Sequence, residues 1–144
     1  MKVSVIICTH NPREDYLRRV LDALRHQSLP IGDWELLLID NASQAPLANR
    51  FDLSWHPNAR HLLEPELGKM NAWILGIKES KGEIIVFVDD DNILTLNYLE
   101  TVFAIGEEWP FIGAWGGSVV LETERPLPDW CKDQVWRLDR KSVV

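Results

Sequence analysis

Short apolar runs that are typical of buried β-strands alternate along this chain with segments of helical periodicity. The strand-like runs are residues 3–8 (VSVIIC), 34–39 (WELLLI), 60–64 (RHLLE) and 84–88 (IIVFV). Apolar residues recur between them at i, i+3, i+4 and i+7, the spacing of an amphipathic helix. This alternation predicts an α/β fold: a Rossmann-like, mostly parallel sheet flanked by helices.

Two of the expected helices carry an apolar stripe, which we expect to face the sheet. The first stripe is Leu17, Val20, Leu21 and Leu24, and the second is Met70, Trp73, Ile74 and Ile77. Lys81 and Gly82 predict that the second helix ends there with a glycine cap. A third helix is expected around residues 96–103, and a strand or hairpin over residues 112–122.

Size, charge and cysteine content narrow the class of protein. The 144 residues fit one domain, and 22 acidic against 15 basic residues argue against a general nucleic-acid binder. The longest apolar run, residues 84–88, is too short to cross a membrane. Cys8 and Cys131 lie far apart and no secretory segment precedes them, so we expect free thiols in the cytoplasm.

Polar clusters directly follow three of the four predicted strands. They are Thr9-His10-Asn11, Asp40-Asn41 and Asp89-Asp90-Asp91. Ligands of open α/β sheets bind beyond the carboxyl ends of the strands. The sequence therefore predicts a binding cleft at this edge of the sheet, formed by these clusters.

The acidic cluster suits a divalent cation. If the strand continued through it, Asp89 and Asp91 would point the same way, roughly 6.6 Å apart. Two such charges repel by about 2.5 kcal/mol at an effective dielectric constant near ~20. Mg²⁺ or Mn²⁺ would offset this repulsion and bridge the carboxylates to a diphosphate. The alternative interpretation is an acidic turn surrounded by solvent.

Four segments, in order, resemble signatures of the family 2 glycosyltransferases, which have the GT-A fold. They are VSVIICTHNP, YLRRVLDALRHQ, DWELLLIDNAS and GKMNAWILGIKESKGEIIVFVDDDN. The resemblance covers residues 2–92 well and 113–130 more loosely. It implies a single GT-A-like domain over residues 1–144. Residues 1–92 would be the nucleotide-sugar-binding part, and 112–144 would begin the acceptor-side part. Because family members run well past this length, it also implies a C-terminally truncated fold.

The resemblance assigns the strand-end residues to a nucleotide-sugar donor. Thr9 and Asn11 would border the nucleotide, and Asp40 would hydrogen-bond the base, which is typically uracil. An Asx turn through Asp40 and Ser43 is the alternative role for this carboxylate.

The remaining assignments concern the diphosphate and the cation. Asp89 would face the ribose or a metal-bound water, Asp91 would ligate Mg²⁺ or Mn²⁺, and Asp90 would lie between these roles. Lys69 matches a lysine that lies near the diphosphate, whereas Trp73 stands where many members have an arginine. The alternative for Lys69 is an exposed lysine at a helix start.

The resemblance implies inverting, metal-dependent transfer of a sugar to an acceptor hydroxyl, and the donor that we expect is a nucleotide-diphosphate sugar of the UDP-sugar type. The acceptor is an unknown glycan, lipid or protein, and the oligomeric state stays undecided. Glu122, Glu124 and Asp129 lie in no motif that would mark a catalytic base, so the base is unassigned. Two alternatives remain open. One is a catalytically incomplete nucleotide-sugar-binding domain or subunit, and the other is an α/β enzyme of a different class that uses a cluster of aspartates for catalysis. We expect a cytoplasmic protein, either free or peripheral to the inner face of a membrane.

Overall fold

The computed structural model describes residues 1–120, 126 and 128–132 of the chain. The chain divides into two units, Met1–Glu108 and Trp109–Val144. All of the strand-end residues singled out above belong to the first unit. That unit therefore contains the candidate site.

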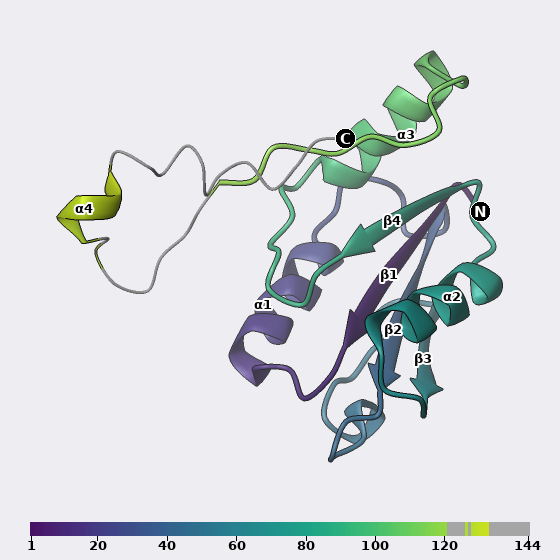
Figure 1. Ribbon diagram of the computed structural model, residues 1–144. Helices are drawn as coiled ribbons and strands as arrows, with labels where there is room; N and C mark the ends of the chain where they lie inside the picture. Colours follow the sequence, from purple (N-terminus) through teal and green to yellow (C-terminus); the bar gives the residue numbers. More distant parts are fainter. Residues whose placement is uncertain (121–125, 127, 133–144) are drawn as a thin grey trace. The chain divides into compact units, whose positions relative to one another are not determined.

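Four parallel strands form the sheet of the first unit in the order β3-β2-β1-β4 (Figure 1). They are β1 (Val3–Thr9), β2 (Trp34–Asn41), β3 (Ala59–Glu64) and β4 (Ile84–Val88). The register pairs Thr9 of β1 with Asp40 of β2, and Ile7 of β1 with Val88 of β4. The carboxyl ends of these three strands therefore meet at one edge, which confirms the predicted parallel sheet.

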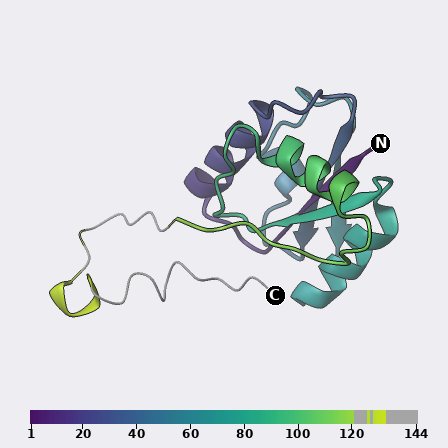
Figure 2. The ribbon, with the colours of Figure 1, turned by 90° about the horizontal axis from the view of Figure 1, so that it is seen from above.

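Helices cover both faces of this sheet (Figures 1 and 2). Helices α1 (Glu14–Arg25) and α3 (Tyr98–Glu108) lie on one face, and α2 (Lys69–Glu79) lies on the other. The end of α1 and the start of α3 are joined where Leu99 N donates to Gln27 Oε1 at 3.0 Å. Helix α1 buries the predicted stripe of Leu17, Val20, Leu21 and Leu24.

The predicted inner face of α2 is wrong. Met70, Ile74 and Ile77 are exposed, and the helix buries Ala72 and Gly76 instead. A Cβ atom at Gly76 would lie 2.7 Å from Ile6 and 2.8 Å from Ile39, so only a small residue lets the helix approach the sheet this closely. The close approach selects the small residues, and the larger apolar side chains remain outside.

The predicted glycine cap is also wrong, because α2 ends at Glu79. Gly82 instead lies against β1, where an added Cβ would be 2.5 Å from Ser4 N and 2.6 Å from Val3 C. The Ser4 hydroxyl accepts from Gly82 N at 2.7 Å and donates to the buried Glu35 carboxylate at 2.6 Å. Gly82 is therefore needed for the contact between the α2–β4 connection and the sheet.

Two further predictions about strands need correction. Strand β4 was expected to be fully buried, but it is an edge strand of the described sheet and Phe87 is 43% exposed. No strand forms in residues 112–120 of the predicted strand or hairpin, and residues 121–122 lie outside the described residues. The described part of the second unit contains a short helix, α4 (Asp129–Lys132). Across the described ranges, no helix has both the length and the apolar character needed to cross a membrane.

Candidate functional site

Thr9 links the ends of β1 and β4 at the predicted edge. Its side chain is buried, and its hydroxyl donates a hydrogen bond to the Asp90 carboxylate. The register places Asp40 beside Thr9 on the neighbouring strand. Three of the residues that the sequence singled out, on three different strand ends, are thus neighbours in the fold.

Asp40 organises the loop that follows β2. Its Oδ1 accepts from Ser43 N at 2.9 Å and its Oδ2 accepts from Leu47 N at 3.0 Å, and the residue is only 7% exposed. Burial by itself raises the pKa of Asp40. The hydrogen bonds from Leu47 and Ser43, with a smaller contribution from His10, outweigh burial and hold this pKa below its usual value. The Asx turn given above as the alternative role is therefore formed.

The loop after β1 is fastened to the loop after β2. Asn11 N donates to Ser43 Oγ at 2.9 Å, and Asn11 Oδ1 accepts from Gln44 N at 2.9 Å. Asn11 has a φ of 48°, a left-handed conformation that asparagine adopts more readily than most residues. These contacts hold Thr9 and Asp40 at the ends of a pair of connected loops.

Asn41 has a role that sequence reasoning missed. Its Oδ1 accepts from Gly68 N at 2.8 Å, and its Nδ2 donates to the carbonyl of Glu66 at 2.7 Å. The side chain thereby holds the loop that leads into α2 and fixes where Lys69 begins that helix. The available signal was an asparagine at the end of a strand, but nothing local named its partners.

Lys69 reaches from the start of α2 to the acidic cluster. Its Nζ lies 3.0 Å from Asp89 Oδ1 and 5.1 Å from the centroid of the Trp73 ring. Trp73 stacks in turn on Phe87 of β4, with ring centroids 4.7 Å apart.

The neighbouring Cys8 thiol is partly buried, and burial raises its pKa to about 12. The nearby Lys69 ammonium lowers this pKa, and the Asp89 carboxylate raises it further. Cys8 is therefore a poor nucleophile here.

The geometry that we predicted for the acidic cluster is wrong. Strand β4 ends at Val88, and residues 89–92 form a turn in which Asn92 N donates to the Asp89 carbonyl at 3.1 Å. The alternation of side chains along a strand therefore does not apply to Asp89 and Asp91. Asp91 is exposed, and its carboxylate makes no hydrogen bond or ion pair with another described residue.

The sheet divides the candidate residues between its two faces. Cys8 packs on the α2 side with Ile6, and side chains alternate along a strand, so Thr9 lies on the α1 side. Thr9 meets Asp90 there, whereas Asp89 meets Lys69 on the α2 side. A ligand that contacts both pairs has to lie across the ends of the strands.

The donor set suits a cation that the protein holds weakly by itself and shares with a substrate, rather than one that protein ligands hold tightly. No group of three or more histidine, cysteine or acidic side chains in the described part of the chain is placed to hold a metal ion. Mg²⁺ and Mn²⁺ commonly take one or two carboxylates and complete their shell with water and substrate phosphates. Asp91, which has no partner among the described residues, and half-exposed Asp89 fit this second kind of site.

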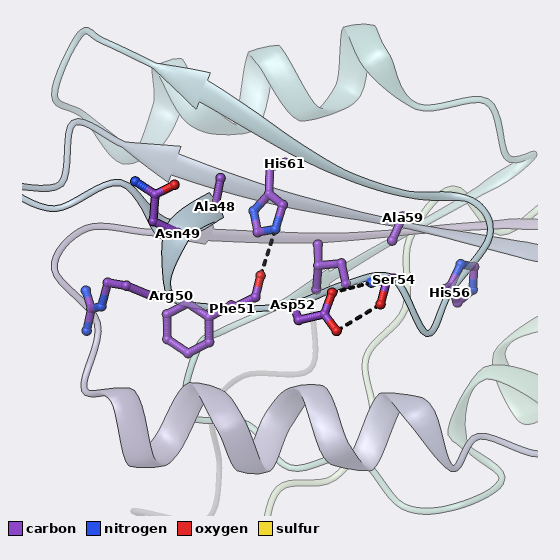
Figure 3. Close-up of a pocket in the computed structure, with 10 residues that line it drawn as sticks. Ala48, Asn49, Arg50, Phe51, Asp52, Ser54, His56, Ala59 and His61 are labelled. Atoms are coloured by element: carbon purple, nitrogen blue, oxygen red, sulfur yellow. Dashed lines mark hydrogen bonds between the residues drawn. The ribbon is translucent and has the colours of Figure 1, made fainter.

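A hollow of about 490 Å³ lies elsewhere in the first unit, between β3 and the segment that follows η1 (Leu47–Asn49). Figure 3 shows His61 pointing from β3 toward the carbonyl of Phe51, which lies 3.0 Å from its Nε2. None of the residues predicted for the site lines this hollow. The candidate site at the strand ends is therefore separate from it.

This chain is similar to a known protein family, to curated proteins and to solved structures. The model of the family described as glycosyl transferase family 2 matches residues 4–140. The chain belongs to this family. Glycosyltransferase AglE of Haloferax volcanii is 36% identical over 93 residues, which are 62% of this chain and 30% of that protein.

Two proteins of Staphylococcus aureus are also similar to this family 2 chain. The poly(ribitol-phosphate) β-N-acetylglucosaminyltransferase TarP is 29% identical over 110 residues, 74% of this chain and 33% of that protein. The crystal structure of TarS 1–349 in complex with UDP aligns with a TM-score of 0.74 at 23% identity, covering 90% of this chain and 38% of that chain. The likeness confirms the predicted GT-A fold. The chain spans about a third of the length of these curated relatives.

Proposed function

We propose that this chain binds the donor of a glycosyltransferase that transfers a sugar from a UDP-sugar to an acceptor hydroxyl. The observation that carries the proposal is the meeting of Thr9, Asp40 and the acidic turn at one edge of the sheet. Family membership supports glycosyl transfer, and the solved structures of TarS include complexes with UDP and with UDP-GlcNAc. In this proposal residues 1–92 bind the donor and residues 112–144 begin the acceptor side.

The chain's own residues would position the donor. Thr9 and Asn11 would border the nucleotide. Asp40 accepts from Ser43 N and Leu47 N in the loop after β2, and its remaining lone pairs would accept from the base. Asp91 and Asp89 would hold Mg²⁺ or Mn²⁺, which supplies positive charge against the developing charge on the diphosphate. Lys69 lies beside Asp89 and would add a second positive charge.

Transfer would invert the anomeric carbon. A deprotonated acceptor hydroxyl attacks that carbon from the face opposite the diphosphate, so the new glycosidic bond forms as the bond to the diphosphate breaks. Asp129 belongs to the second unit, and Glu122 and Glu124 lie outside the described residues. The base that deprotonates the acceptor is therefore left unassigned.

The test is isothermal titration of the chain with UDP, first with Mn²⁺ and then with a chelator. We expect binding with Mn²⁺ that falls at least about tenfold, ~1.4 kcal/mol, in the chelator and in Asp91→Asn. Asp22→Asn is the matched control, because it removes an exposed carboxylate from α1 on the same unit. Equal affinity with the chelator, or equal losses in the two variants, would contradict the shared cation.

One observation favours a second candidate, a nucleotide-sugar-binding domain or subunit without transfer activity. The aspartates that the proposal uses at the strand-end edge already hold the loop, the donor or the cation, so none of them is left to act as the base: Asp40, Asp89, Asp90 and Asp91. Release of free sugar or of UDP from UDP-sugar, measured with the chain alone, separates the candidates. Binding without any release supports the binding domain, and release supports the enzyme.

A further inference from the structure

Lys69 is tied to a carboxylate that the proposed function needs for another purpose. Its ammonium lies 3.0 Å from Asp89 Oδ1, and both side chains are partly exposed, 58% for Lys69 and 42% for Asp89. Asp89 is also one of the two carboxylates proposed to hold the divalent cation. The lysine ammonium and the cation are both positive and seek the same oxygen atoms, so each weakens the binding of the other.

We propose that Lys69 is a positioning residue that exchanges partners at this edge. In the structure its ammonium neutralises Asp89; when a divalent cation binds Asp89, the ammonium leaves and turns to the donor diphosphate. This inference rests on the proposed function, because the second partner is the diphosphate of the proposed donor. The exchange explains how Lys69 can neutralise Asp89 before the cation binds and contact the diphosphate afterwards.

The Trp73 ring can hold the Lys69 ammonium near the strand ends after it leaves Asp89. Its ring centroid is 5.1 Å from Lys69 Nζ, within the range of a cation–π contact. Stacking on Phe87, with an interplanar angle of 28°, ties the indole to β4 and keeps it beside the acidic turn. The ammonium can therefore break its contact with Asp89 without swinging away from the strand ends.

Lys69 is the one basic residue in the first part of α2 that can make this exchange. Between Gly68 and Ile77, Lys69 is the single lysine or arginine. The next basic side chain on the helix, Lys78, lies nine residues further along, ~13 Å by the helical rise. Lys78 is exposed and has no hydrogen bond or ion pair with another described residue, so it provides a matched control.

The first measurement is Mn²⁺ affinity without nucleotide, followed by the electron paramagnetic resonance signal of free Mn²⁺. An exposed ion pair is weak, so we expect Lys69→Gln to bind Mn²⁺ about two- to fivefold more tightly than the wild type. Lys78→Gln removes the same charge from the same helix and should change the affinity much less. Lys69→Arg keeps the competing charge and should stay near the wild type.

The second measurement is UDP affinity at saturating Mn²⁺, where the same variant should change in the opposite direction. We expect Lys69→Gln to bind UDP at least about threefold more weakly, because one charge-assisted contact to the diphosphate is lost. A residue with a purely structural role would weaken both ligands, and a simple competitor would weaken neither. The pair of opposite changes is therefore specific to partner exchange.

Several results would overturn the proposal. These are no Mn²⁺ binding by the wild type, equal Mn²⁺ affinities of Lys69→Gln and Lys78→Gln, or unchanged UDP affinity in Lys69→Gln. The proposed function is judged separately by UDP binding of the wild type in Mn²⁺. If the wild type binds UDP and Lys69→Gln still shows no gain in Mn²⁺ affinity, the exchange is wrong and the donor site stands.

Discussion

Replacing Asp40 by asparagine should destabilise the first unit, because two backbone N–H groups depend on its two carboxylate oxygens. Ser43 N donates to one oxygen and Leu47 N donates to the other. An asparagine side chain offers one oxygen, so one N–H would face an NH₂ group. A hydrogen bond to a charged group contributes about 1.5–3 kcal/mol, and leaving a buried donor unpaired costs about 1–3 kcal/mol. These two ranges describe the same lost contact and overlap, so we expect a loss of about 2–3 kcal/mol.

Urea unfolding followed by circular dichroism measures this loss, and the chain contains a matched control. Asp52 accepts from Ser54 N at 2.9 Å and from Ser54 Oγ at 2.8 Å, but it lies on the surface. Water can replace its contacts, so Asp52→Asn should change the free energy of unfolding much less than Asp40→Asn. The comparison separates burial from the mere presence of the hydrogen bonds.

Acid provides a second check on Asp40. Because its pKa in the folded state is lowered, its contribution is complete above the unfolded value of about 3.9 and is lost as the pH falls through the folded value. The stability gap between wild type and Asp40→Asn should therefore narrow between pH 7 and pH 3. Equal unfolding midpoints at pH 7, or a gap that is unchanged in acid, would refute the reasoning.

Three further substitutions test other parts of the fold. Gly82→Ala places a Cβ 2.5 Å from Ser4 N and should lower the free energy of unfolding by about 2 kcal/mol or more. Gly32→Ala has no atom within 4 Å of the added Cβ and should be tolerated, so equal unfolding midpoints of the two variants would contradict the argument. Burial lowers the pKa of His56, and Glu35 opposes this effect. The wild type should therefore lose stability relative to His56→Phe as the pH falls below about 6.5, and parallel pH profiles of the two proteins in urea unfolding would contradict this prediction. Asn41→Ala removes the contacts to Gly68 N and the Glu66 carbonyl, so it should raise hydrogen exchange in residues 64–68; unchanged exchange would contradict its role.

The sheet could be predicted because its signal is local. A β-branched apolar run followed by a polar cluster marks both a strand and its carboxyl end, and β4 begins and ends where the sequence predicted. The meeting of the strand ends then follows from parallel topology, as the pairing of Thr9 with Asp40 confirms. The candidate edge therefore follows from pattern and topology together.

The packing of α2 could not be predicted from apolar periodicity. The larger side chains Met70, Ile74 and Ile77 also recur at helical spacing, and they drew the prediction to the exposed face. The distance between helix and sheet decides which face is buried. The need for a small residue at Gly76 becomes visible only when the positions of Ile6 and Ile39 are known. Close approach is a tertiary property, so a pattern within one helix does not contain it.

The details of the site depended on long-range contacts and on turn chemistry. Asp40 reaches Leu47 across a loop without periodicity, and Lys69 reaches Asp89 across twenty residues. Neither contact has a local signature. The turn at residues 89–92 was given only as the alternative interpretation, because strand alternation was extended through Asp89 and Asp91, although aspartate and asparagine both favour turns.

The central claim is that the strand-end edge of the sheet holds the donor diphosphate together with a divalent cation. Mn²⁺ is paramagnetic and broadens the NMR signals of nearby backbone amides, so a two-dimensional amide spectrum with UDP and Mn²⁺, compared with UDP and Mg²⁺, locates the cation directly. We predict that the strongest broadening falls on Asp89, Asp90, Asp91 and their neighbours at Thr9 and Lys69. Strong broadening confined to the hollow beside β3, or none above that of free Mn²⁺, would contradict the account.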